Sequence, residues 1–70
     1  MNPPPKLYAL AVDALKGYLD QTHWKDQSLE GLLSVEDSNF SSWRSDGFND
    51  LAEVRAALKL AWARLVGGDQ

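Results

Sequence analysis

The sequence predicts an all-α domain in which two long amphipathic helices pack as an antiparallel helical hairpin, with one or two short helical turns between them. Apolar side chains recur at helical spacing in two segments, residues 7–20 and 51–66. Each segment would form a helix about 20–25 Å long at 1.5 Å per residue, so the two are matched in length. The residues between them are mostly polar and acidic. Since 70 residues hold one domain at most, we expect a single domain over residues 1–70.

The first helix follows a proline-rich lead-in at residues 1–5, which is predicted to be extended up to Pro5. Apolar residues then cover an arc of roughly 200° on the helical wheel, wider than the stripe of an ordinary surface helix. Gly17 falls on the polar side, where it costs about 1 kcal/mol of helix propensity relative to alanine. The residues of this helix assigned to the core or to a dimer interface are Leu7, Tyr8, Ala11, Leu15 and Tyr18.

The middle of the chain is predicted to form short helical pieces. Residues 29–33 carry three leucines at helical spacing, and residues 34–37 are predicted to form a turn that offers acceptors to a following helix. Residues 38–45 would form that second short helix. Asp46 and Gly47 would end it, because glycine at this position favours a left-handed exit.

The last helix has the clearest signals. Asp50 and Glu53 form a pair similar to a capping box, with aspartate in place of the usual serine or threonine. Gly67 and Gly68 would stop the helix, which leaves residues 67–70 as a flexible tail. Apolar residues between these limits follow the spacing of a coiled-coil seam. The seam residues assigned to the core or to a dimer interface are Leu51, Val54, Leu58, Ala61, Trp62 and Leu65.

The small size of the chain predicts association. A domain this small buries only about 60% of the surface of its unfolded chain, so small scaffolds usually add disulfides, a metal or a partner. The chain has no cysteine, its only imidazole is His23, and its acids lack the spacing of a calcium loop. We therefore expect no metal and no cofactor, and a homodimer in which the wide apolar face of the first helix packs against its mate to form a bundle.

The sequence offers no pattern that supports catalysis. General acid–base chemistry requires two titrating groups that converge in one pocket, and none of the serines lies in a nucleophile elbow. We therefore expect a protein that is not an enzyme. The N-terminus lacks a basic run followed by an apolar core, and no apolar stretch reaches the roughly 20 residues that span a bilayer. These features predict a cytoplasmic protein without membrane contact.

Residues 29–45 resemble a helix-turn-helix DNA-binding motif in the spacing of their apolar residues. Under this alternative, residues 38–44 would form the recognition helix. The pattern departs from the motif at Glu30, where a small residue normally lets the helices touch, and at Ser34, where the turn usually has glycine. Since Arg44 is the only base in this stretch, we do not expect nucleic-acid binding. The apolar residues that carry the resemblance are Leu29, Leu33, Val35, Phe40 and Trp43.

Charge and aromatic content favour a role in protein binding. Residues 26–50 carry acids at six positions and a single base, and an acidic surface attracts basic partners. Tryptophan and tyrosine are enriched at the hot spots of protein interfaces. We expect a larger protein as partner, with a basic surface such as one that binds DNA. The residues assigned to partner binding are Trp24, Glu36, Asp37, Phe40, Trp43 and Asp46.

In size, acidity and lack of catalytic residues, the chain is similar to the small inhibitor proteins that phages and mobile elements direct at host regulators. This similarity implies a regulatory inhibitor of the anti-activator type, which would bind a larger host protein such as a transcription regulator. The alternatives are a DNA-binding regulator with a helix-turn-helix and a structural or assembly subunit.

Overall fold

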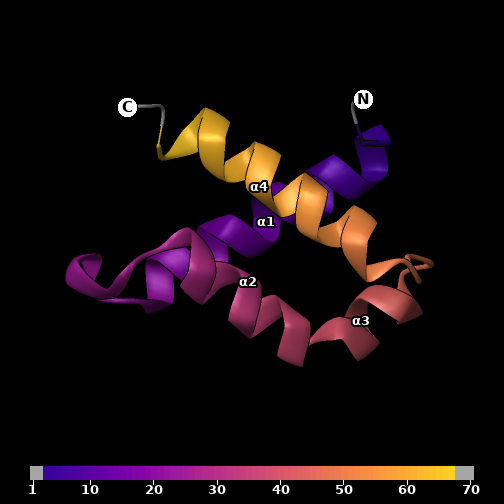
Figure 1. The fold of residues 1–70 in the computed structure, drawn as a ribbon, viewed down its shortest axis with the longest axis horizontal. Coiled ribbons are helices and arrows are strands. Elements are labelled where there is room, and N and C mark those ends of the chain that lie inside the picture. Colours follow the sequence, from indigo (N-terminus) through magenta and orange to yellow (C-terminus); the bar gives the residue numbers. More distant parts are fainter. Residues whose placement is uncertain (1–2, 68–70) are drawn as a thin grey trace.

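The computed structural model describes residues 3–67, which fold into four α-helices and one short 3₁₀-helix without a strand. The all-α prediction is therefore confirmed for these residues. Of the predicted lead-in and tail, residues 1–2 and 68–70 lie outside the described part. Figure 1 shows the helices in order along the chain: α1 (Pro5–Gln21), η1 (Trp24–Asp26), α2 (Leu29–Ser38), α3 (Phe40–Ser45) and α4 (Leu51–Leu65).

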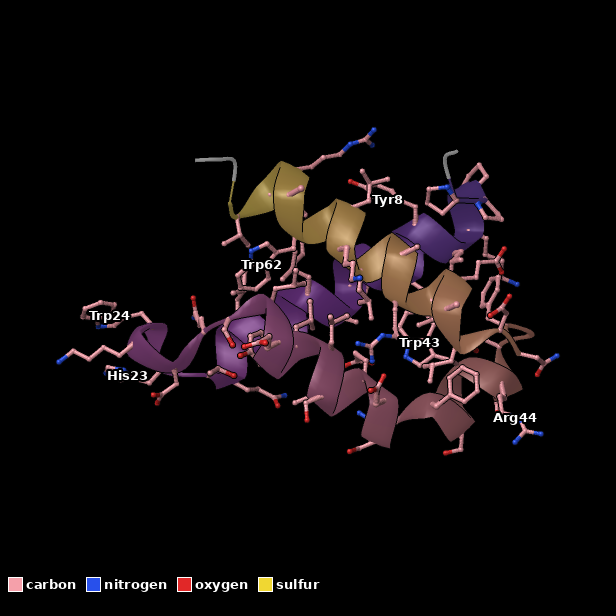
Figure 2. All side chains as sticks on the ribbon, in the orientation of Figure 1. Tyr8, His23, Trp24, Trp43, Arg44 and Trp62 are labelled. Atoms are coloured by element: carbon pink, nitrogen blue, oxygen red, sulfur yellow. The ribbon has the colours of Figure 1, made fainter. Side chains whose placement is uncertain are left out.

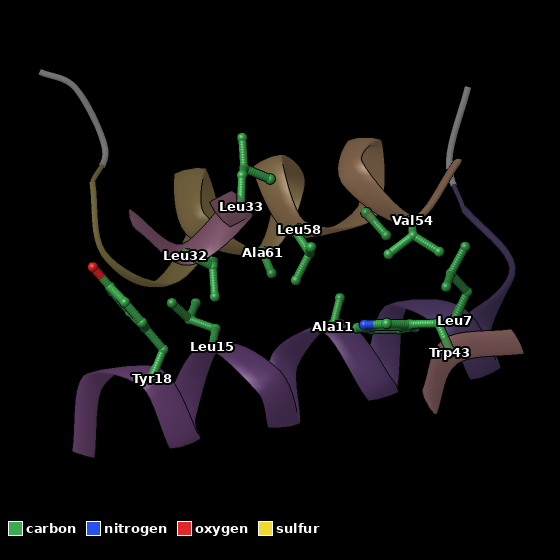
Figure 3. Packing of buried hydrophobic residues seen from close by; sticks show 11 residues of the cluster. Leu7, Ala11, Leu15, Tyr18, Leu32, Leu33, Trp43, Val54, Leu58 and Ala61 are labelled. Carbon is green, nitrogen blue, oxygen red and sulfur yellow. The ribbon is translucent and has the colours of Figure 1, made fainter. Parts of the chain in front are cut away.

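The two long helices are not arranged as the predicted antiparallel hairpin. α1 and α4 pack across each other and run the same way, since Leu7 and Val54 lie at one end of the core while Tyr18 and Ala61 lie toward the other (Figure 3). The connection explains this difference. An antiparallel helix pair is joined by a short loop that reverses the chain once. Here α2 and α3 first carry the chain back along the domain, so α4 starts again near the beginning of α1 (Figure 1).

Each of the three longer helices begins at a residue suited to a helix start. Pro5 occupies the first turn of α1, where its missing N–H is not needed. The Ser28 hydroxyl accepts a backbone N–H from the first turn of α2 at 2.9 Å. The Asp50 carboxylate accepts two backbone N–H groups of α4 at 3.0 and 3.4 Å, which confirms the predicted cap.

The turn predicted at residues 34–37 is wrong. α2 continues through these residues to Ser38, and Asn39 alone separates α2 from α3. Residues 34–37 contain neither glycine nor proline, so nothing in them stops a helix that Ser28 has capped. A helix-turn-helix requires a turn of three or four residues before its recognition helix. Residues 29–45 therefore do not form a helix-turn-helix, although the spacing of their apolar residues resembles one. In addition, α3 has only six residues.

The end of α3 follows the sequence prediction. Gly47 has a φ of 96°, a left-handed conformation that side chains with a Cβ rarely adopt. The backbone N–H of Phe48 then donates to the carbonyl of Trp43 at 3.0 Å, which closes the turn. The chain can therefore turn sharply after α3, and only three residues separate Gly47 from Leu51, where α4 begins.

The buried side chains form one core between α1 and α4, closed on a further side by α2 and α3 (Figure 3). α4 and α2 both pack on α1, so two helices of the same chain cover much of the wide apolar arc that motivated the predicted dimer. None of the described helices has the length and apolar character needed to cross a membrane. The buried core residues are Leu7, Ala11, Leu15, Tyr18, Leu32, Leu33, Trp43, Val54, Ala57, Leu58 and Ala61.

Four residues assigned to the core or dimer lie outside the fully buried set. Leu51 and Leu65 are 36% and 53% exposed, because they occupy the two ends of α4, away from its crossing with α1. They therefore lie outside this core, and a place for them in a dimer interface stays a prediction. Tyr8 and Trp62 are half-buried against the core, and the Arg64 guanidinium lies 5.4 Å from the centre of the Tyr8 ring.

Candidate functional site

Trp24 projects from the molecule on η1, the short helix between α1 and α2. It is 70% exposed, more than any other large apolar residue in the described part of the chain. Figure 2 shows it at one end of the domain, far from Trp43 and Arg44. Tryptophan is normally highly buried, and it is enriched at the hot spots of protein interfaces. Trp24 was assigned to partner binding from the sequence, and that role stays a prediction.

The neighbours of Trp24 limit its movement. The His23 ring stacks on the indole with 5.8 Å between ring centres, and the Lys25 ammonium lies 5.5 Å from the centre of the Trp24 ring. His23 is held in turn, because its Nδ1 accepts the backbone N–H of Lys25 at 3.2 Å. Because these contacts already restrict the indole, less side-chain entropy is lost when a partner immobilises it.

The loop that carries Trp24 is braced by two polar side chains. The Tyr18 hydroxyl donates to the Asp26 carbonyl at 3.2 Å and accepts the Ser28 N–H at 3.1 Å. Gln27 donates through Nε2 to the carbonyls of Leu19 and Thr22 at 3.1 and 3.0 Å. The path of the loop is therefore fixed against the end of α1. We call residues 23–25, with Trp24 at their centre, the Trp24 tip.

Two of the acids assigned to partner binding are engaged within the chain. Glu36 accepts the indole N–H of Trp43 at 2.9 Å. Asp37 pairs with Arg55 at 2.6 Å and so connects α2 to α4. Asp46 is exposed at the end of α3. The acidic middle is thus partly a structural feature, and a charge reversal at Glu36 or Asp37 would disturb the fold as well as the surface.

The two aromatic residues of α3 point toward the core. Trp43 is buried and uses its indole N–H on Glu36, which corrects its assignment to the partner surface. Phe40 is half-buried and packs against the same core. In a domain with few large side chains, α3 is too short to hold itself in place without such anchors. Phe40 and Trp43 therefore attach α3 to the core.

A groove runs between α1 and the α2–α3 segment. Its two adjoining halves share Glu36 and Asn39 as lining residues. One half reaches Asp46 on α3, and the other reaches Gln21 and Thr22, two residues before Trp24. We call this surface the α1–α2 groove. Its α1 side is made by Leu10, Ala14, Gly17 and Gln21, and its α2–α3 side by Val35, Glu36, Asn39, Ser42 and Asp46.

Sequence reasoning missed the α1–α2 groove. Leu10 and Ala14 were counted in the apolar arc, while Gly17 was placed on the polar side and given no role. Gly17 is the residue that could have indicated the groove from the sequence. A glycine in the middle of a helix lowers the stability of the helix, so its presence often has a packing or functional reason. A Cβ built on Gly17 meets no atom within 4 Å, so the space above it is open.

The chemistry offered by these residues is that of a contact surface. Within residues 3–67, no three His, Asp or Glu side chains gather where they would hold a metal ion. The Trp24 tip is aromatic and basic, and the α1–α2 groove is lined by both apolar and polar side chains, with carboxylates among them. No known family model, curated protein or solved structure matches this chain.

Proposed function

We propose that this chain is a small, non-catalytic protein-binding module, a regulatory inhibitor that docks on a larger protein and blocks it. A transcription regulator with a basic DNA-binding surface fits the acidity of the chain as a target. We propose further that the module acts as a homodimer, because a domain of this size gains stability from association. Its partner is a cytoplasmic protein.

The observation that supports this proposal most strongly is the exposure of Trp24 on a braced loop. Leaving an indole in water forgoes about 1.5–3 kcal/mol or more of burial free energy that a large apolar side chain provides. Tyr18 and Gln27 hold the loop against the end of α1, so the indole is presented from a fixed position. An interface that buries a prepositioned indole recovers this free energy and loses little entropy.

Net charge contributes the second argument. The chain carries 10 acids and 7 bases, and Asp13, Asp20, Asp26, Glu30 and Asp46 are all exposed. Opposite fields on two proteins accelerate their encounter, and this acceleration falls as the salt concentration rises. We therefore expect association with a basic partner to be fastest at low ionic strength.

Affinity capture from native cells tests the proposal. The tagged wild-type chain should retain a defined protein that Trp24→Ala retains at least about tenfold less well, as expected for a hot spot. Val66→Ala is the matched control, because Val66 is another exposed apolar residue and follows directly after α4. Both variants should melt like the wild type. A chain that captures no defined protein, or captures it equally with Trp24→Ala, contradicts the proposal.

A further inference from the structure

The α1–α2 groove is of mixed character, with small and apolar residues on its α1 side and with carboxylates and amides on its α2–α3 side. Leu10, Ala14 and Gly17 of α1 are half-buried, and Val35 of α2 is 43% exposed despite its β-branched apolar side chain. These residues follow one another along the groove. Exposed apolar residues that are scattered singly are normal on a protein surface, whereas a continuous strip with a polar rim is typical of a binding groove.

The charges around this strip are mostly of one sign. On α1, Asp13 lies four residues before Gly17 and Asp20 three residues after it, so both share a side of the helix with Gly17. Both are exposed and form no ion pair within residues 3–67. Glu36 and Asp46 line the opposite edge. Two bases share this side of α1: Lys6 lies a turn before Leu10, at the end of the groove, and Lys16 lies beside Gly17 and four residues before Asp20.

The dimensions suit a helix. From Leu10 to Gln21, the α1 side of the groove is about 16 Å long at 1.5 Å per residue, the length of about three helical turns. The small side chains lie in its middle, at Ala14 and Gly17, and nothing lies within 4 Å of a Cβ built on Gly17. Residues this small let a partner backbone approach closely, which a larger side chain at position 17 would prevent.

We infer that the α1–α2 groove binds the apolar face of a basic amphipathic helix of the partner protein. This inference rests on the proposed function and assigns the partner a chemistry: apolar anchors at i, i+3, i+4 and i+7, with lysine or arginine on both flanks. The apolar stripe packs over Ala14, Gly17 and Val35. The basic flanks meet Asp13 and Asp20 on one edge and Glu36 and Asp46 on the other. The groove ends beside the loop of Trp24, so one helix can engage both surfaces.

Peptide titration of the ¹⁵N-labelled chain tests the groove directly. The probe is a synthetic helix of about 15 residues built from leucine, alanine and lysine, with one apolar stripe between lysine flanks. Two comparison peptides have glutamate in place of lysine, or the same residues in scrambled order. We expect the basic amphipathic peptide to bind at least about tenfold more tightly than either, and to shift the backbone signals of Ala14, Gly17 and Val35.

Matched variants separate binding from folding. Gly17→Gln fills the groove with a good helix former, so it should weaken peptide binding at least about tenfold without lowering the melting temperature. Ala9→Gln places the same side chain on an exposed position of α1 and should bind like the wild type. Asp13→Lys combined with Asp20→Lys should weaken binding about tenfold, whereas Glu30→Lys, an exposed reversal outside the groove lining, should not.

The outcomes distinguish this inference from the function on which it rests. Any of three results overturns the inference that the groove binds a basic amphipathic helix. They are equal affinity for all three peptides, signal shifts confined to residues outside the groove, and wild-type peptide binding by Gly17→Gln. Shifts of the groove signals with protein concentration alone would mean that a second copy occupies it, which also overturns the inference. If Gly17→Gln captures the native partner as well as the wild type does, the groove is not the site that binds the partner, but the proposed protein-binding function is still supported. If the chain captures no partner at all, the proposed function itself fails.

Discussion

Two glycines within helices have opposite surroundings. A Cβ at Gly17 meets nothing within 4 Å, whereas a Cβ at Gly31 would collide with the Tyr18 hydroxyl, which also holds the loop before α2. Gly17→Ala should therefore raise the free energy of unfolding by about 0.5–1 kcal/mol, through helix propensity alone. Gly31→Ala should lower it by about 1–2 kcal/mol, because a buried tyrosine must move and lose hydrogen bonds. Thermal melts of both variants measure this difference.

The control removes the colliding atom. In a Tyr18→Phe background, Gly31→Ala no longer meets the Tyr18 hydroxyl, its nearest neighbour, and should be much less destabilising than in the wild type. If Gly31→Ala is equally harmful in both backgrounds, the cost does not come from the Tyr18 hydroxyl. If Gly17→Ala destabilises the chain, the open space above Gly17 is absent in solution.

The bond between Glu36 and Trp43 yields a second prediction at the scale of a residue. Glu36→Ala leaves the indole N–H of Trp43 without its acceptor and should cost about 1–3 kcal/mol in denaturant unfolding. Glu36→Gln keeps an acceptor oxygen at the same place and should cost much less. Equal losses for the two variants would show that the charge of Glu36, and not its hydrogen bond, stabilises the domain.

Some residue environments could be predicted from the sequence and others could not. Leu7, Ala11 and Leu15 are buried as their spacing predicts, because helical periodicity fixes which side of α1 faces inward. The sequence left Trp24 and Trp43 equivalent, since each is an aromatic residue in a polar segment. Their contrast depends on tertiary placement: Trp43 is buried in the same core cluster as residues of α1 and α4, while η1 stands at the end of the domain.

At the scale of the element, α4 provides the sharpest test of the packing. Leu58 is fully buried against α1, and Lys59, one residue later, is exposed. Leu58→Ala should cost about 2–5 kcal/mol, from lost burial and the cavity that remains. Small domains have about 5 kcal/mol of stability or little more, so this variant should be close to unfolded at room temperature. Circular dichroism in urea measures the loss.

Lys59→Ala is the matched control, and we expect it to change the free energy of unfolding by less than about 0.5 kcal/mol. If the two variants unfold at the same urea concentration, α4 does not face α1 with the side that contains Leu58. Leu65→Ala should also cost much less than Leu58→Ala, because Leu65 lies half in solvent.

Helix boundaries were predictable where a local signal exists. Pro5, Asp50 and Gly47 each act within one turn of their own position, so the start of α1, the start of α4 and the end of α3 follow from the sequence. The boundary between α2 and α3 carries no such signal. Asn39 separates them without a glycine or proline, and the prediction placed a turn several residues too early, at residues 34–37.

At the scale of the whole molecule, the path of the chain determines which surfaces stay exposed and available to a partner. Because α2 and α3 return the chain before α4, two helices of the same chain cover much of the apolar arc of α1. The apolar arc of α1 could be predicted from the sequence. The path of the chain between α1 and α4 could not, since helix periodicity contains no information on the relative direction of two helices. The surfaces left for a partner include the α1–α2 groove, the Trp24 tip and a hollow between Pro3–Pro5 and α4.

The proposed homodimer is testable at this scale. Light scattering at tens of micromolar should give twice the mass of the 7.8 kDa chain. The reason is the small core, which association would supplement. Leu65→Ala and Leu51→Ala, which truncate exposed ends of the predicted seam, should shift the mass toward the monomer while leaving the helical content unchanged. A monomer mass with a cooperative melt contradicts the dimer but leaves the binding surfaces intact.

The central claim is that this chain acts through the Trp24 tip. Its three tryptophans give three indole N–H signals in one ¹H–¹⁵N spectrum, each from a different environment: the exposed tip, the bond to Glu36, and the half-buried Trp62. The most direct measurement is to add the captured partner to the ¹⁵N-labelled chain and follow these signals. We predict that the Trp24 signal shifts or broadens while that of Trp62 stays unchanged. A Trp24 signal that stays unchanged at saturation would contradict the claim.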